Sequence, residues 1–175
     1  MNLKDHIRSI PDYPKKGILF RDITTLIKNE TAFTEAINQI TDRSKKYKID
    51  KIAAIESRGF VFASAVSYLL KKPFILLRKK NKLPAETHSV DFELEYGTAT
   101  IEVHKDSIDK NDSVLIIDDL IATGGTADAA AKLVEISGGK VAAFIFAINL
   151  FDLGGCDILV KKGYKVENLI EFPGH

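Results

Sequence analysis

The chain has 175 residues and a formal net charge of +1, with 45% hydrophobic and 28% charged residues, which is typical of one soluble globular domain. The small net charge excludes a general attraction to nucleic acid or anionic membranes. The longest apolar run, residues 141–148, is far below the ~20 residues of a membrane-spanning helix, and a lone cysteine, Cys156, excludes a disulfide framework. We expect a cytoplasmic protein with neither nucleic acid nor membrane as partner.

The predicted elements begin with an arm of about thirty residues. This segment is rich in Pro, Asp and Lys and predicts an irregular arm laid over the domain. Apolar residues then recur at helical spacing from Phe33 to Ile40, which predicts an amphipathic helix. Beyond it, apolar strands alternate with helices. Strands are predicted at 51–56, 74–78, 114–118, 141–148 and 166–170, helices at 59–72 and from the glycine loop to about Ile136, and a hairpin at 92–104.

Alternating strands and helices predict an α/β fold in which a mainly parallel sheet carries helices on both faces. No linker divides the chain, so residues 1–175 are predicted to form a single domain. Ligands of such sheets bind at the carboxyl ends of the strands. Two polar motifs follow predicted strands at these ends, ESRG at 56–59 and DDLIATGGT at 118–126.

The second motif predicts a phosphate site. Gly124 and Gly125 let a ligand approach the backbone amides, and the helix that follows offers free N–H groups and its positive dipole end. Asp118 and Asp119, expected to be exposed at the strand end, can accept hydrogen bonds from a ribose diol. Phosphate and diol together favour a 5-phosphoribosyl group. A plain strand–turn–helix with a glycine cap and the acidic Mg²⁺ pocket of a receiver domain are the alternatives.

The ESRG motif predicts a second anion site. Arg58 offers a fork of donors suited to phosphate oxygens, and Gly59 opens a helix. Alone, this motif could equally be a helix cap beside a surface arginine. Two anion sites flanking one ribose match phosphoribosyl pyrophosphate (PRPP). The basic run at 78–82 could contribute, or could be a solvated loop.

Other cofactor motifs are absent from the sequence. It contains no P-loop and no G-x-G-x-x-G, and its histidines lack metal-ligand spacing. These histidines are His6, His88, His104 and His175. We expect no direct protein ligand to a metal, and a Mg²⁺ cofactor held mainly by PRPP oxygens.

The sequence resembles the adenine phosphoribosyltransferases, a branch of the type I phosphoribosyltransferases, over essentially its whole length. The motifs that carry the resemblance are YPKKGILFRDIT, ESRGF, RKKNKLP, LEYGT, VLIIDDLIATGGT, and INLFDLGG with the ending FPGH. The resemblance implies transfer of the phosphoribosyl group from PRPP to adenine N9, giving AMP and pyrophosphate in purine salvage, with Mg²⁺ and usually as a homodimer. It also implies the type I phosphoribosyltransferase-like fold with a flexible hairpin lid and an N-terminal hood, residues 1–30.

The resemblance further implies a role for each matching residue. The 5-phosphate is held by Ala122, Thr123, Gly124, Gly125 and Thr126, and the ribose by Asp118 and Asp119. The pyrophosphate is held by Glu56, Ser57 and Arg58, in a loop that often has a non-proline cis peptide, and by Arg78, Lys79 and Lys82. The adenine site is formed by Leu19, Phe20 and Arg21, and the catalytic residues are Glu95, Tyr96 and Arg58, the first two on the lid.

One departure and two rival functions accompany this interpretation. Asn81 stands where relatives commonly have glycine, which could stiffen the basic loop. The rivals are a phosphoribosyltransferase for hypoxanthine or xanthine, and a non-catalytic PRPP-binding regulator. Because GILF offers no side chain able to read a base edge, we expect main-chain groups around Leu19 and Arg21 to select adenine.

Overall fold

The computed structural model describes residues 1–94 and 97–175. Its strands are β1 (Arg8–Pro11), β2 (Leu19–Asp22), β3 (Lys51–Ile55), β4 (Phe74–Lys79), β5 (Thr87–Leu94), β6 (Gly97–His104), β7 (Ser113–Ile121), β8 (Lys140–Leu150) and β9 (Val166–Phe172). Its helices are η1 (Leu3–His6), α1 (Thr24–Ile27), α2 (Glu30–Ser44), α3 (Arg58–Leu70), α4 (Gly125–Ile136), η2 (Phe151–Leu153) and α5 (Gly155–Lys161).

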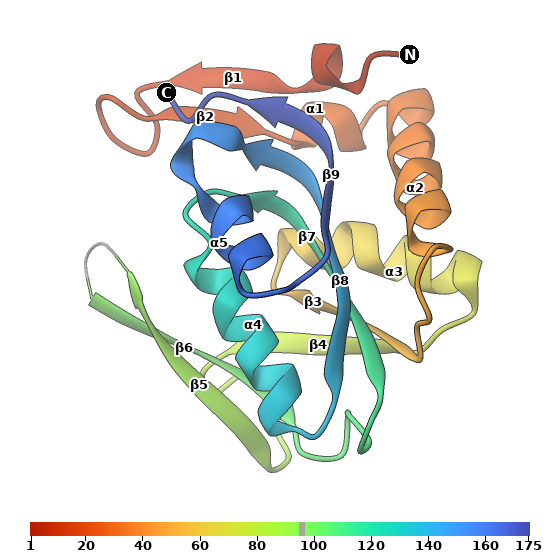
Figure 1. Ribbon diagram of the computed structural model, residues 1–175. Helices are drawn as coiled ribbons and strands as arrows, with labels where there is room; N and C mark the ends of the chain where they lie inside the picture. The colour runs from red at the N-terminus through yellow and green to blue at the C-terminus, as the bar shows by residue number, and fades with distance from the viewer. Residues whose placement is uncertain (95–96) are drawn as a thin grey trace.

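A seven-stranded sheet in the order β5-β6-β4-β3-β7-β8-β9 forms the centre of the molecule (Figure 1). The five strands from β4 to β9 are parallel, while β6 runs antiparallel to both β4 and β5. The sequence prediction of a mainly parallel sheet is therefore confirmed. None of the helices among the described residues is long and apolar enough to cross a membrane.

Alternation along β7 explains the two helical layers. Successive side chains of a strand point to opposite faces, so Leu115 and Ile117 join the core beneath α2 and α3. Val114 and Ile116 join the core beneath α4, where Leu159 of α5 also packs. All four β7 side chains are fully buried. Both faces of the sheet are covered, as the sequence predicted.

The strand that carries the aspartates is longer than predicted. It continues through Asp118 and Asp119 to Ile121, because β8 pairs with it up to Ile121 and Asn149. Asp119 is only 6% exposed and Asp118 is partly buried. The expected exposure of this pair at a strand end is therefore wrong. The two carboxylates are set into the carboxyl-terminal part of the central strand β7.

The hood is more regular than predicted. Its strands β1 and β2 pair antiparallel from Arg8 with Asp22 to Pro11 with Leu19, forming a separate two-stranded sheet at the top of Figure 1. The turn between them is closed by Asp12, whose carboxylate accepts a 2.8 Å hydrogen bond from the Gly17 amide. The irregular arm expected there is therefore wrong, because backbone pairing orders a polar segment that lacks apolar periodicity.

The predicted hairpin is confirmed and is longer than expected. It begins at Thr87 and pairs with β6 up to His104. Figure 1 shows it projecting from the sheet at the lower left. Glu95 and Tyr96 lie outside the described residues. The sequence analysis did not predict two short elements after β8. These are η2, within the INLFDLGG motif, and α5, which begins at the last glycine of that motif.

Candidate active site

A cavity of about 670 Å³ opens at the carboxyl ends of β3 and β7. Its walls come from the ESRG segment, the carboxyl half of the VLIIDDLIATGGT motif, and the β5–β6 hairpin. Among the residues expected to bind substrate, the lining includes Glu56, Ser57, Arg58, Lys79, Asp118, Asp119, Ala122, Thr123, Gly124, Gly125 and Thr126. Phe92 and Leu94 of the hairpin face them. The structure therefore gathers both predicted anion motifs around one cavity.

The predicted phosphate loop ends at the first turn of α4. Gly124 caps this helix with φ of 92°, a left-handed conformation that glycine adopts without strain. No side chain caps the helix, so its first N–H groups are available to a ligand. Because α4 has 12 residues, its dipole adds a positive field at the same point. This geometry suits a phosphate dianion.

Behind this loop lies a glycine that the sequence analysis did not select. The amide of Gly155 donates a 3.0 Å hydrogen bond to the carbonyl of Ala122. A Cβ on Gly155 would lie 2.5 Å from that oxygen and 2.9 Å from the Gly124 nitrogen. Only a residue without a side chain permits this approach. The start of α5 thus supports the loop from the side away from the cavity.

The two aspartates lie next to each other near the end of β7. The Asp119 amide donates a 2.8 Å hydrogen bond to Oδ1 of Asp118. Burial, and then the charge of Asp119, raise the pKa of Asp118 well above its ordinary value. Gly59 leaves room for this carboxylate, since a Cβ there would lie 2.8 Å from Asp118 Oδ1. The pair therefore offers oxygen acceptors held in fixed positions.

Arg58 joins the ESRG motif to the aspartates. Its Nε donates a 2.6 Å hydrogen bond to Oδ2 of Asp119, while its side chain remains 57% exposed. The Asp119 carboxylate is the main cause of the raised pKa of Arg58. The peptide bond between Glu56 and Ser57 is cis, as the family resemblance implied. The Arg58 guanidinium thus lines the cavity, and its Nη groups are available to a ligand.

Glu56 lines the cavity, and its carboxylate is bound by the end of β4. Its Oε1 accepts a 2.6 Å hydrogen bond from the Lys79 amide and lies 3.3 Å from Nε of Arg78. The Glu56 side chain is 12% exposed. A carboxylate would repel pyrophosphate, whereas these contacts fix the end of β4 beside the ESRG loop. Glu56 therefore holds basic residues in place.

The basic run lies only partly at the cavity. Lys79 and Lys80 line it, whereas Arg78 and Lys82 are not among the lining residues. Lys80 was missed, although it belongs to the same basic run. Asn81 has φ of 66°, a left-handed conformation that Asn tolerates better than most residues. The left-handed conformation explains why relatives commonly have glycine at the position of Asn81.

The hood meets the cavity through Phe20. The centroid of its ring lies 5.9 Å from Cζ of Arg58 and 5.1 Å from the ring centroid of Tyr13. Leu19 and Phe20 are partly buried. The described lining of the cavity does not include the predicted adenine residues, which lie beside it on the hood. Phe20 is thus the hood residue whose contact with Arg58 links the two regions.

The side chain of Arg21 points to the C-terminal segment. Its guanidinium donates a 2.5 Å hydrogen bond to Ser9 Oγ and a 3.2 Å hydrogen bond to the Pro173 carbonyl. Cζ lies 4.2 Å from the centroid of the Phe172 ring. Burial lowers the pKa of Arg21. These contacts commit the Arg21 side chain to β1 and the C-terminal segment.

Besides the cavity, metal-binding groups and the cysteine could carry chemistry. Within residues 1–94 and 97–175, no group of three His, Cys, Asp or Glu side chains could hold a metal. The only cysteine, Cys156, is half-buried, and burial chiefly raises the pKa of its thiol to about 11. Near neutral pH it is therefore a thiol and a poor nucleophile.

Known proteins share this arrangement along the chain. Residues 23–169 match the phosphoribosyl transferase domain family. An adenine phosphoribosyltransferase from Pelagibacter ubique is 87% identical over 175 residues, covering 100% of both chains. The crystal structure of adenine phosphoribosyltransferase from Thermoanaerobacter pseudethanolicus has a TM-score of 0.93 at 48% identity, covering 97% of this chain and 98% of that chain. An APRTase from Giardia lamblia complexed with 9-deazaadenine has a TM-score of 0.92 at 34% identity, covering 98% of both chains.

Proposed function

The chain belongs to the phosphoribosyl transferase family, and we propose how its residues divide the work of the reaction. It transfers the 5-phosphoribosyl group from PRPP to adenine, giving AMP and pyrophosphate in purine salvage. One observation carries the assignment to this cavity. The phosphate loop, the aspartate pair and Arg58 line the same space.

The phosphate loop, Ala122 to Thr126, holds the 5-phosphate. Its support is the uncapped start of α4 and the left-handed Gly124, which together present amides and a positive dipole end. Asp118 and Asp119 accept hydrogen bonds from the ribose hydroxyls, since both line the cavity beside this loop. The sugar is thereby fixed at two points, which orients its reacting carbon.

Pyrophosphate binds at the other end of the ribose. Ser57 and Arg58 are exposed at the start of α3, and Lys79 and Lys80 line the same wall. Arg58 now pairs with Asp119, so a ribose hydroxyl that binds Asp119 would release the guanidinium to the leaving group. Arg78 and Lys82 add positive charge nearby, with Glu56 holding Arg78. Positive side chains here stabilise the departing pyrophosphate.

Mg²⁺ is expected to arrive with the substrate. The two cavity aspartates are engaged with each other and with Arg58, so they form no ready-made cage of oxygens. The ion is therefore held mainly by PRPP oxygens. When bound, it neutralises charge on the leaving pyrophosphate.

Adenine lies against Phe20, and main-chain groups of Leu19 and Arg21 read its edge. This proposal fits the Arg21 side chain, which is committed to Ser9 and Pro173. Adenine N9 forms the new bond to C1 of the ribose as the bond to pyrophosphate breaks, with inversion at that carbon. A Phe20→Ala variant should raise KM for adenine and leave KM for PRPP unchanged. Equal effects on both would contradict this base site.

Glu95 and Tyr96 are proposed as lid residues that exclude water from the reacting centre. The adjoining strands support this role, because Phe92 and Leu94 already form one wall of the cavity. Water would hydrolyse PRPP, so a cover protects the substrate. AMP or PRPP should slow amide hydrogen exchange over residues 87–104. Exchange already as slow as in β7 without ligand would contradict a closing lid.

We also propose one domain, residues 1–175, with the hood as its base-binding part. Leu3, Ile7 and Leu26 of the hood lie in the same core cluster as Ile117 of β7. The hood is therefore packed into the central core. A single cooperative melting transition would support this assignment, and two separate transitions would contradict it.

A homodimer is proposed through the outer side of α3 and β4. Tyr68 is 82% exposed and Leu76 is 40% exposed. Phe60, which belongs to the same helix as Tyr68, packs on Phe74 of β4, the strand that carries Leu76. Tyr68→Glu should convert a dimer to a monomer in sedimentation velocity. A monomeric wild-type protein would overturn this proposal.

A cytoplasmic location is the last expectation, and cell fractionation tests it.

The central experiment measures AMP formation by the purified protein from PRPP with adenine, hypoxanthine or xanthine. Strong preference for adenine is expected. Comparable rates with hypoxanthine would contradict adenine specificity, and PRPP binding without turnover of any base would indicate a regulator.

A further inference from the structure

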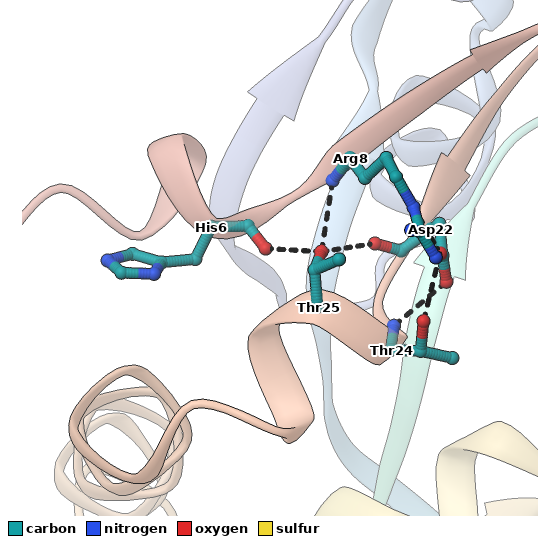
Figure 2. A network of polar contacts seen from close by, with 5 residues as sticks. All are labelled: His6, Arg8, Asp22, Thr24 and Thr25. Atoms are coloured by element: carbon teal, nitrogen blue, oxygen red, sulfur yellow. Dashed lines mark hydrogen bonds and ion pairs between the residues drawn. The ribbon is translucent and has the colours of Figure 1, made fainter.

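A buried carboxylate lies where the hood's second strand ends. Asp22 is 6% exposed and follows directly after the stretch Leu19 to Arg21. It is not among the residues that line the cavity, although its charge contributes to the raised pKa of Arg58, which does line it. Figure 2 shows it at the centre of a polar network that joins β1, β2 and α1. A buried charge is costly unless it is paired, so this carboxylate must have a compensating role.

Four donors converge on this carboxylate. Nε and Nη2 of Arg8 donate to Oδ2 at 3.0 and 2.5 Å. The amide and the hydroxyl of Thr24 donate to Oδ1 and Oδ2, each at 2.9 Å. The Thr24 amide is the largest cause that lowers the pKa of Asp22 to about 2, so the group is ionised near neutral pH. Arg8 and Asp22 are also the end pair of the β1–β2 register.

The hydroxyl of Thr25 also connects β1 with α1. Oγ1 of Thr25 donates a 2.7 Å hydrogen bond to the His6 carbonyl and accepts a 3.1 Å hydrogen bond from the Arg8 amide. Figure 2 shows Thr25 between His6 and Asp22, and its Oγ1 also lies 3.2 Å from the Asp22 carbonyl oxygen. The start of β1 and the end of β2 are thereby tied to the first turn of α1.

The hood needs such ties. An isolated two-stranded hairpin is marginally stable in water. Most of β1 and the turn to β2 are exposed, while Ile23 and Leu26 just beyond Asp22 are buried in the core. Asp22 is therefore the point at which the exposed base-binding strand passes into the packed part of the molecule.

We propose that Asp22 is a positioning residue for adenine, which fixes the stretch Leu19 to Arg21 beside the cavity by clamping β1 and α1. The proposal rests on the base site of the proposed function. Without the clamp, the hood would occupy its base-binding position for only a fraction of the time. The apparent affinity for adenine falls by that fraction. The phosphate loop and the aspartate pair lie on the central sheet and not on the hood, so the affinity for PRPP should change less, through the lost charge of Asp22 near Arg58.

The test is steady-state kinetics of Asp22→Asn, which keeps the shape and removes the charge. KM for adenine should rise about tenfold, and KM for PRPP should change less than about twofold. Arg8→Gln removes the exposed partner and should shift the adenine KM in the same direction by a smaller factor. That variant supplies the answer if Asp22→Asn does not fold.

Asp112→Asn is the matched control. Asp112 is a mostly buried carboxylate that accepts a 2.7 Å hydrogen bond from the Asp109 amide and lies 2.8 Å from Lys51 Nζ. It stands before β7, at the end of the strand away from the cavity. Its substitution should lower the melting temperature and leave both KM values unchanged.

Two outcomes would overturn the positioning role. One is an adenine KM in Asp22→Asn that rises no more than in Asp112→Asn; the other is an equal rise for PRPP. The Phe20→Ala variant separates the hypotheses. If it leaves the adenine KM unchanged, the base site itself is wrong and this proposal falls with it.

Discussion

The proposed phosphoribosyl site and the proposed base site are built differently. The phosphoribosyl cradle consists of strand ends and a helix start in the central sheet, where Asp119 and Gly124 are buried. The hood is a separate two-stranded sheet whose base-binding strand is only partly buried and is fixed by polar side chains. The proposed phosphoribosyl site is therefore built from backbone and side chains of the central sheet. The strands of the hood are held mainly by local polar contacts, while Leu3, Ile7 and Leu26 anchor the hood in the central core.

The largest expected effect lies in the cradle. Asp118→Asn with Asp119→Asn should reduce PRPP affinity and turnover by roughly 10²–10⁴-fold, because each charged hydrogen bond contributes about 1.5–3 kcal/mol. Binding calorimetry with PRPP measures the loss, and circular dichroism melts report the fold. Because Asp118 is partly buried with a raised pKa, a neutral amide should be tolerated there. Unchanged PRPP affinity would remove the aspartates from the ribose site.

The support behind the cradle gives the next effect. Gly155→Ala places a methyl group 2.5 Å from the Ala122 carbonyl, so the phosphate loop must move. Overpacking of this kind costs about 1–3 kcal/mol, which should raise KM for PRPP roughly tenfold to a hundredfold. The KM for adenine should stay unchanged.

Gly139→Ala is the control for that substitution. A Cβ there would lie 2.9 Å from Ile108 Cγ2 and 3.1 Å from the Asp112 carbonyl, away from the cavity. It should destabilise the protein without changing either KM. Equal PRPP effects in the two alanine variants would show that the Gly155 contact serves stability alone.

A smaller effect is expected in the hood. Leu19 is partly buried, so Leu19→Ala should weaken adenine and hypoxanthine binding alike by roughly tenfold, from lost apolar contact. The ratio of kcat/KM for the two bases should persist, because main-chain groups read the base edge. A collapse of that ratio would assign specificity to the side chain and contradict the contrast between the two regions.

The smallest effect concerns pH and the hood clamp. The pKa of Asp22 falls from its ordinary 3.8 to about 2, so its ionised form stabilises the folded state above about pH 4. That contribution is lost as the pH falls towards 2. The stability gap between the wild type and Asp22→Asn should shrink by about 1 kcal/mol from about pH 5 to about pH 3. Urea unfolding measures it, and a constant gap would contradict the ionised clamp.

Local signals predicted the cradle better than the hood. Gly124 and Gly125 before an alanine-rich helix indicate a loop and helix start by their own conformational preferences, and the structure has both. The burial of Asp118 and Asp119 was not predictable, because it follows from pairing with β8, a strand that starts about twenty residues later. A strand end is set by its neighbours as much as by its own residues.

The hood and the Gly155 contact likewise depend on residues that are distant in sequence and that local patterns do not reveal. Strands β1 and β2 carry no clear alternation, and Pro11 and Pro14 weigh against strands, yet backbone pairing forms the hairpin. Gly155 supports Ala122 across a gap in sequence that no local pattern spans. Lys80 could have been selected from its place in the basic run, but its position on the cavity wall depends on how β4 ends.

The pairing of β3 with β7 has a consequence for biosynthesis. Lys51 lies opposite Val114 in the sheet, and Asp50 bonds to Ser113 across a sequence separation of 63 residues. During translation, β3 must therefore wait for the β7 segment to leave the ribosome. Until then the apolar β3 segment lacks its central neighbour and is open to aggregation. Closing so long a loop slows folding, so the sheet centre, and with it the cavity, is expected to form late on the nascent chain.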